Sequence, residues 1–228
     1  MSWEIQYFIM IRLKFLGTSN ANPHPDRRQS GVLLSIDETH YLFDCGDAIA
    51  TALWNDKSIS LNHLNAVFFS HRHADHMGGL SALVLLMHQR IKNSREIQPG
   101  AGFEWRTPPK PSTTNECAFF IPGDEDQAEF FSELLDRMHT ADFEIAFRKK
   151  LYPFQGRSLI FDDGQIQVES FPTNHCMDSA GFILRSRSKS LIYSGDIKNP
   201  QIVANIIGSD VLDLVIIENA HLDRKSVV

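Results

Sequence analysis

The sequence is poor in cysteine, has no long apolar run and carries no excess of positive charge. Its three cysteines, Cys45, Cys117 and Cys176, form no Cys-x-x-Cys pair, which argues against a disulfide framework and suits a reducing compartment. No run of about 18 apolar residues occurs, so we expect no membrane-spanning helix and a cytoplasmic location. The net charge of −6 argues against a broad basic surface for nucleic acid.

The composition of the 228 residues is that of a globular chain, with 43% hydrophobic and 22% charged residues. We predict a single domain over residues 1–228. Residues 1–9 are interpreted as an extension in front of Met10, and residues 93–116, which are rich in proline and glycine, as a loop insertion. Residues 223–228 are interpreted as a non-native tail, because their codons can spell the start of a common sequencing adapter.

Short apolar runs and helical periodicities alternate in blocks along the chain. Strands are expected at 10–16, 31–36, 39–43, 66–70, 117–121, 143–149, 166–171, 181–186, 190–194 and 213–218. Helices are expected at 47–56, 78–91, 124–139 and 199–208. Because strands come in runs with helices between them, the pattern favours a layered α/β fold with mixed sheets.

Histidine is the abundant exception, since three of the 10 histidines fall within six residues in Ser70-His-Arg-His-Ala-Asp-His76. His71 and His73 are two apart and point the same way in an extended segment, and Asp75 and His76 follow in the turn that enters a helix. Imidazole and carboxylate suit zinc, iron or manganese. The pattern predicts a metal site, whereas a solvated polar loop is the alternative. Isolated histidines such as His63 are expected to be surface or structural residues.

The His-x-His-x-Asp-His motif after a strand resembles the signature of the metallo-β-lactamase superfamily. Three further segments resemble that family in the right order: Leu42-Phe-Asp44-Cys-Gly46, Thr173-Asn-His175 and Ser194-Gly-Asp196. The resemblance implies a four-layer αββα sandwich of two mixed β-sheets. The family's last histidine ligand follows a later strand, and no matching segment exists after His221. We therefore expect the last strand and helix unit to be missing.

The resemblance also implies two divalent metal ions, zinc first and manganese or iron as alternatives. His71, His73 and His175 would hold one ion, Asp75 and His76 the second, and Asp196 would bridge them. The remaining candidates, which would support the ligands from behind, are Asp44, Glu218 and His221. The implied chemistry is hydrolysis by a metal-bridging hydroxide, with Asp75 orienting the nucleophile and shuttling its proton.

Two branches of the superfamily compete for the substrate. Leu16–Pro23, with Arg27, Arg28 and Ser30, resembles the first loop of tRNase Z-like and cyclic phosphodiesterases. We therefore predict a phosphodiesterase acting on a small phosphodiester or an RNA 3′ end, with homodimer formation compatible with the resemblance. The 21 positions from His175 to Asp196 leave no room for a tRNA-gripping arm and match lactonases and thioesterases of the glyoxalase II type. A truncated, catalytically defective metal-binding fragment is the third interpretation.

Overall fold

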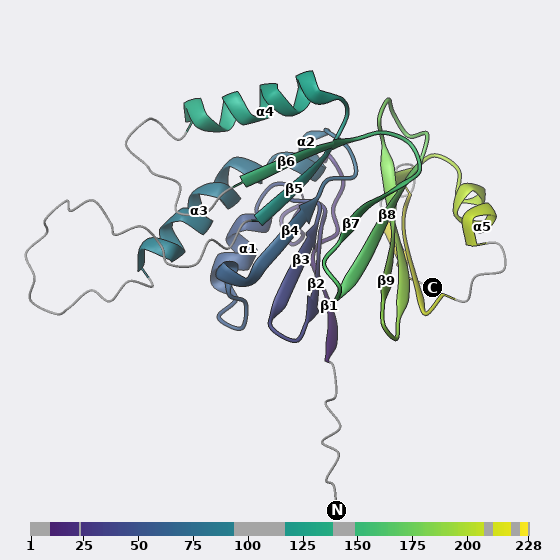
Figure 1. The fold of residues 1–228 in the computed structure, drawn as a ribbon, viewed down its shortest axis with the longest axis horizontal. Helices are drawn as coiled ribbons and strands as arrows, with labels where there is room; N and C mark the ends of the chain where they lie inside the picture. Colours follow the sequence, from purple (N-terminus) through teal and green to yellow (C-terminus); the bar gives the residue numbers. More distant parts are fainter. Residues whose placement is uncertain are drawn as a thin grey trace, which may run out of the picture.

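Two mixed β-sheets face each other in the computed structural model, which describes residues 10–22, 24–93, 117–138, 149–207, 212–219 and 224–227 (Figure 1). Within these residues each sheet has six strands. The first sheet follows chain order: β1 (Ile11–Gly17), β2 (Gly31–Ile36), β3 (Thr39–Phe43), β4 (Leu64–Phe68), β5 (Cys117–Pro122) and β6 (Lys149–Phe154). The second sheet runs in the order β12 (Arg224–Val227), β11 (Leu214–Asn219), β10 (Ser190–Ile197), β9 (Ala180–Ser186), β8 (Ile166–Pro172) and β7 (Ser158–Asp162).

Both sheets combine antiparallel and parallel neighbours. In the first, β1 to β3 pair antiparallel, whereas β3 to β6 pair parallel. In the second, β10 and β11 are the parallel pair and the other neighbours are antiparallel. Parallel neighbours end at the same edge of a sheet, and loops at such an edge commonly form binding sites.

The helices cover the outer faces of the two sheets. The first sheet packs against α1 (Ile49–Asn55), α3 (Leu80–Asn93) and α4 (Glu125–Met138), which contribute Leu53, Leu83 and Leu135 to a shared core. The second sheet packs against α5 (Gln201–Ile207) through Val203. Figure 1 shows this order of layers, with α5 on the side away from the other helices. The predicted αββα sandwich is confirmed.

An apolar core fills the space between the sheets because successive strand residues point to opposite faces. In β2, Val32 and Leu34 face this core, whereas Leu33 faces the helices. The ring of Phe68 is fully buried and stacks on Phe43 and Phe120, with centroid distances of 5.0 and 4.8 Å. Aromatic contacts of this kind add to the stability that burial provides.

Several expected segments differ from the structure. The strand expected at 143–149 falls mostly outside the described residues, and β6 begins at Lys149 instead. Strand β7 was not expected; its residues are mostly half-buried or exposed. Residues 224–227, interpreted from sequence as part of a non-native tail, form β12 beside β11. Residues 1–9 and 94–116 lie outside the described part of the chain.

Strand β10 contains one residue more than its parallel neighbour between two paired positions. Tyr193 pairs with Ile216 and Asp196 pairs with Glu218, so three steps in β10 match two in β11. Gly195 provides the irregularity with a φ of 53°, and a Cβ there would lie 2.5 Å from the Cβ of Ser70. Glycine accepts this left-handed conformation and this close approach without steric cost.

A short helix separates the histidine motif from α3. α2 (Ala74–Met77) contains Asp75, His76 and Met77, all buried, and a one-turn 3-10 helix, η1 (Leu61–His63), precedes β4. None of the helices in the described ranges is long and apolar enough to cross a membrane.

We expect Phe68→Ala to lower the free energy of unfolding by about 3–5 kcal/mol, because it removes the central ring of the aromatic core. Urea denaturation followed by circular dichroism measures this change. Phe130→Ala is the matched control, since Phe130 is 59% exposed and should change stability by less than about 1 kcal/mol. Equal losses in both variants would contradict the assignment of the core.

Candidate metal centre

The candidate site lies where the ends of strands from both sheets meet. The histidine motif follows β4, and Asp44 follows β3 in the first sheet. His175 lies in the loop between β8 and β9, and Asp196 lies near the end of β10. The backbone N–H of Ala180 donates to the carbonyl oxygen of Ser70 at 2.8 Å, which joins the two loops across the sandwich.

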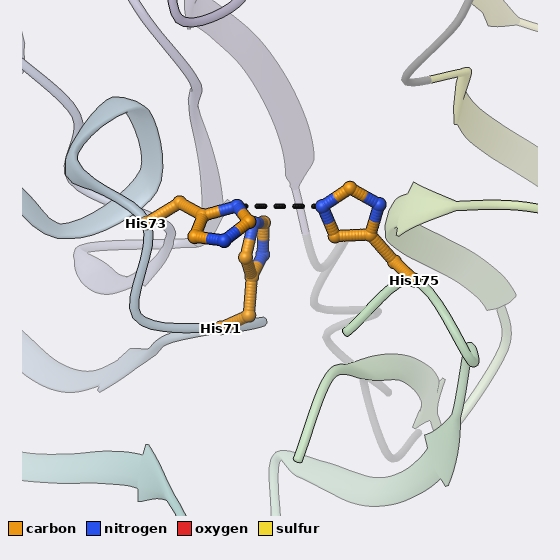
Figure 2. A group of neighbouring side chains, drawn as sticks. All are labelled: His71, His73 and His175. Atoms are coloured by element: carbon orange, nitrogen blue, oxygen red, sulfur yellow. Dashed lines mark hydrogen bonds between the residues drawn. The ribbon is translucent and has the colours of Figure 1, made fainter. Parts of the chain in front are cut away.

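Three histidines form the first group. The Nδ1 atom of His73 lies 3.0 Å from Nε2 of His71 and 3.3 Å from Nε2 of His175. Figure 2 shows a nitrogen of His73 pointing at a nitrogen of His175, with His71 beside His73. A tetrahedral zinc ion, at about 2.0–2.1 Å from each nitrogen, requires ligand atoms about 3.3 Å apart. The three nitrogens suit zinc in element type, and the two distances from Nδ1 of His73 are close to this spacing.

A second group shares one of these histidines. His71, His76 and Asp196 each place one ligand atom within 4.8 Å of the others. Nε2 of His76 lies 3.5 Å from Oδ1 of Asp196, and Oδ2 of the same carboxylate lies 3.5 Å from Nε2 of His175. Asp196 thus faces the histidines of both groups, one oxygen toward His76 and the other toward His175.

Asp75 and Glu218 flank the second group. Nε2 of His76 lies 3.6 Å from Oδ2 of Asp75 and 3.9 Å from Oε2 of Glu218. Both carboxylates are buried. The Asp75 backbone carbonyl accepts a hydrogen bond from Ser30 N–H at 3.0 Å, which ties the histidine motif to the loop before β2.

The buried carboxylate of Asp44 contacts His76 on the side of the ring away from the ligand groups. Asp44 has no exposed surface, and its φ of 58° places it in the left-handed region, which aspartate tolerates better than most residues. Its Oδ1 accepts from Ser70 N–H at 2.7 Å and its Oδ2 from the Ser70 hydroxyl at 2.8 Å. The same Oδ2 lies 2.7 Å from Nδ1 of His76. Such a carboxylate–histidine contact sets the orientation of a ligand ring.

The surroundings of His71 keep its imidazole ring neutral. Burial of its ring and the neighbouring His76 lower the pKa of His71 to about 3, so its nitrogens are neutral at pH 7. Burial also lowers the pKa of His175. A neutral imidazole is the form that coordinates a metal.

His76 and Asp196 carry complementary charges in the metal-free protein. Burial alone would lower the pKa of His76, but the carboxylate of Asp44 and the hydrogen bond to Asp196 raise it well above its ordinary value. Burial alone would raise the pKa of Asp196, but His76, His71 and His175 lower it to about 2. A metal ion bound here would take the place of the His76 proton.

A polar network that sequence reasoning missed crosses between the sheets. The Tyr193 hydroxyl group lies 2.6 Å from Oδ2 of Asp44 and 2.6 Å from Oε1 of Glu218. The Ser30 hydroxyl donates to Oε2 of Glu218 at 2.9 Å. Each contact joins residues far apart in sequence, which is why no local pattern predicted it.

An ion pair links the two histidine-bearing loops at the surface. Nη2 of Arg72, which lies between His71 and His73 in the sequence, is 3.2 Å from Oδ2 of Asp178. Partly exposed pairs of this kind contribute little to stability, but this one connects the loop after β4 to the loop that carries His175. Beside that loop lies a cavity of about 270 Å³, lined among others by Phe154, Asn174, Cys176 and Asp178.

The structure brings together most of the residues expected at the site. The two groups contain His71, His73, His76, His175 and Asp196, with Asp44 and Glu218 behind them and Asp75 beside His76. Asp75 belongs to neither group of ligand atoms within 4.8 Å. His221 lies outside the described residues.

The fold is that of metallo-β-lactamase-fold proteins. The human short form of tRNase Z superimposes with a TM-score of 0.61 at 22% identity, covering 86% of this chain and 73% of that chain. The metallo-β-lactamase-fold protein YhfI from Bacillus subtilis gives a TM-score of 0.63 at 18% identity, covering 90% and 70%. At these identities the likeness shows the shared fold.

Comparison of sequences shows that this chain is also related in sequence to proteins of this fold. Zinc phosphodiesterase ELAC protein 1 of Homo sapiens is 31% identical over 186 residues, which are 74% of this chain and 50% of that protein. Residues 11–98 match the profile of a family described as Anti-Pycsar protein Apyc1. The chain is therefore related to tRNase Z, as the sequence motifs predicted. It spans about half the length of the curated relatives it matches.

We expect zinc to stabilise the metal-free protein against thermal unfolding, because the ligand atoms are assembled only in the folded chain. A zinc concentration 100 times the dissociation constant corresponds to about 2.7 kcal/mol. His71→Ala should lose a large part of this stabilisation, since it removes one of the three nitrogens of the first group. Differential scanning calorimetry with and without zinc measures the effect.

His63→Ala serves as the control, since His63 is exposed and lies in η1, before β4. This variant should keep the zinc-dependent rise in melting temperature. If His71→Ala kept it as well, the two groups would not form a metal centre.

Proposed function

We propose that this chain is the metal-binding catalytic part of a hydrolase that cleaves phosphodiesters. The observation that carries the proposal is the pair of ligand groups that share His71 at the ends of the strands. The relationship to a protein named zinc phosphodiesterase supports the same chemistry and favours zinc over manganese or iron.

The proposed ligands divide between two sites. His71, His73 and His175 would hold one ion, and Asp75 and His76 the other, with the two oxygens of Asp196 reaching both. Bound divalent ions in such sites lower the pKa of coordinated water and neutralise charge on the phosphate oxygens. The residues of the chain then have to orient the substrate, hold the ligands and move protons.

Asp75 is the proposed proton acceptor. Asp75 is 6% exposed, and its Oδ2 lies 3.6 Å from Nε2 of His76, so the carboxylate is next to a proposed ligand and shielded from bulk water. The hydrogen bond from Ser30 to the Asp75 carbonyl holds its backbone. A carboxylate fixed in this way can orient an attacking water molecule and accept its proton, a role worth about 10²–10⁴-fold in rate.

A small phosphodiester fits the surroundings better than a whole tRNA. The 21 positions from His175 to Asp196 are occupied by the rest of the histidine loop, by β9, by the turn at 187–189 and by most of β10, so no extended arm is present there. The match to the Apyc1 family supports a cyclic nucleotide as one such substrate.

Basic residues in the loop before β2 are the proposed contacts for the substrate phosphate. Arg27 and Arg28 lie in this loop, whose backbone is held by hydrogen bonds from Thr18 and Ser19 N–H to the Arg28 carbonyl at 2.9 and 2.8 Å. The loop ends at Ser30, which contacts Glu218 beside the ligand groups. Arginine matches phosphate oxygens in charge and geometry.

A lactonase or thioesterase of the glyoxalase II type is the second candidate. The specific observation in its favour is the same short segment between His175 and Asp196. Those enzymes attack a carbonyl carbon with the same kind of metal centre, so the ligand groups alone do not distinguish the two reactions.

We expect Asp75→Asn to lower kcat for bis-p-nitrophenyl phosphate at least 100-fold, because the amide cannot accept a proton. Release of p-nitrophenol measures the rate, and metal content must be measured in parallel. Asp126→Asn, on the exposed start of α4, is the matched control and should retain full activity. Wild-type turnover by Asp75→Asn at equal metal content would refute this role.

A substrate panel separates the two candidate reactions. The wild-type protein should hydrolyse bis-p-nitrophenyl phosphate or a cyclic nucleotide, and should be slower on a lactone and on a thioester. Hydrolysis of only the lactone or thioester would overturn the phosphodiesterase proposal. Absence of hydrolysis of every substrate in the panel, with two zinc ions bound per chain, would overturn both candidate reactions.

A further inference from the structure

We propose that Tyr193 is a positioning residue, whose buried hydroxyl group holds the Asp44 carboxylate against His76 and thereby aims the outer nitrogen of His76 at Asp196. This inference rests on the proposed function only in taking His76 as a metal ligand. The alignment of His76 itself can be observed in the metal-free protein.

The hydroxyl group of Tyr193 is placed by the packing of its ring. Tyr193 is 1% exposed and belongs to the apolar cluster between the sheets. Its ring centroid lies 5.9 Å from that of Phe43 and 6.5 Å from that of Phe182, to which it is nearly parallel. Because the ring cannot swing without disturbing this packing, the phenol oxygen is a fixed point at the end of the core.

Two carboxylates meet at this fixed point. Oδ2 of Asp44 and Oε1 of Glu218 each lie 2.6 Å from the Tyr193 hydroxyl oxygen. The hydroxyl group carries one hydrogen and donates to one of these oxygens at a time. When it donates to Oδ2 of Asp44, it adds a donor to a fully buried carboxylate, whose charge needs hydrogen bonds to be stable there. The hydroxyl group therefore keeps Asp44 in a defined position rather than merely filling space.

The position of Asp44 determines which way His76 points. Oδ2 of Asp44 lies 2.7 Å from Nδ1 of His76, which directs the other nitrogen, Nε2, toward Asp196 at 3.5 Å. A carboxylate that accepts the Nδ1 hydrogen selects the ring orientation and the tautomer that leave Nε2 for a metal. Tyr193 thus acts on His76 through a single intervening side chain.

The contacts from Tyr193 to Asp44 and from Asp44 to His76 also connect the two sheets at the site. Asp44, Ser70 and His76 belong to the first half of the chain, whereas Tyr193 and Asp196 both lie on β10 in the second sheet. One strand therefore carries a proposed metal ligand and the support for the ligand opposite it. The position of β10 therefore affects both Asp196 and the residue that supports His76.

The test compares Tyr193→Phe with Tyr41→Phe in metal-free protein and in zinc titrations. Tyr41 is the matched control because it is also fully buried and its hydroxyl group donates to a carboxylate, Oδ2 of Asp163, at 2.6 Å. Asp163 belongs to neither ligand group. Each substitution removes one oxygen atom and keeps the ring.

We expect Tyr193→Phe to weaken the binding of one zinc equivalent by 10–100-fold, the usual effect of losing a residue that orients a ligand. Competition with a chromophoric chelator measures the two equivalents separately, and the second should be unchanged. Tyr41→Phe should bind both equivalents like the wild type. Wild-type zinc binding by Tyr193→Phe, or equal losses in both variants, would overturn the proposal.

A readout that does not involve metal separates this inference from the proposed function. In metal-free wild-type protein, ¹⁵N spectra of the histidine side chains should show a hydrogen on Nδ1 of His76 in contact with a slowly exchanging Tyr193 hydroxyl hydrogen. Tyr193→Phe should lose this ordered signal. Absence of the contact in the wild type would overturn the proposal even if Tyr193→Phe failed to fold, whereas failure of phosphodiester hydrolysis alone would leave it standing.

Discussion

A buried carboxylate, that of Asp44, collects the hydrogen bonds on which the rest of the site depends. It accepts from the Ser70 backbone and hydroxyl groups and from Tyr193, and it pairs with His76. Burial alone would raise its pKa, but His76, Ser70 and Tyr193 reverse the effect and lower the pKa below the ordinary value. Removing one partner of such a buried pair commonly costs about 3–5 kcal/mol, so the network and the fold support each other.

The site exists only when the two sheets are packed together. His71, His73 and His76 come from the loop and short helix after β4, whereas His175 and Asp196 come from the second sheet. The aromatic core between the sheets holds these segments at a fixed separation, and the Ala180–Ser70 hydrogen bond joins them at the edge. Metal affinity and folding stability are therefore linked through the same interface.

The sequence predicted the layers and the histidine loop because both depend on local patterns. Apolar periodicity located α3 and most strands, and the spacing of His71, His73 and His76 indicated one shared corner. His175 and Asp196 were assigned by resemblance, since no local spacing connects residues 21 positions apart. Strand β7 was missed because its residues show little apolar alternation. The contact of Tyr193 with Asp44 spans 149 positions and depends on how the sheets pack.

The extra residue in β10 fixes how many residues must separate Tyr193 from Asp196 for the site to form. In a regular strand, residues 193 and 196 would project from opposite faces, yet here one supports His76 and the other faces it. Gly195 absorbs the odd step. Side chains along β10 can drift over evolutionary time, but a single inserted or deleted codon between Tyr193 and Asp196 would uncouple the ligand from its support. We therefore expect related sequences to differ in amino-acid identity along this strand but to keep the number of residues between Tyr193 and Asp196.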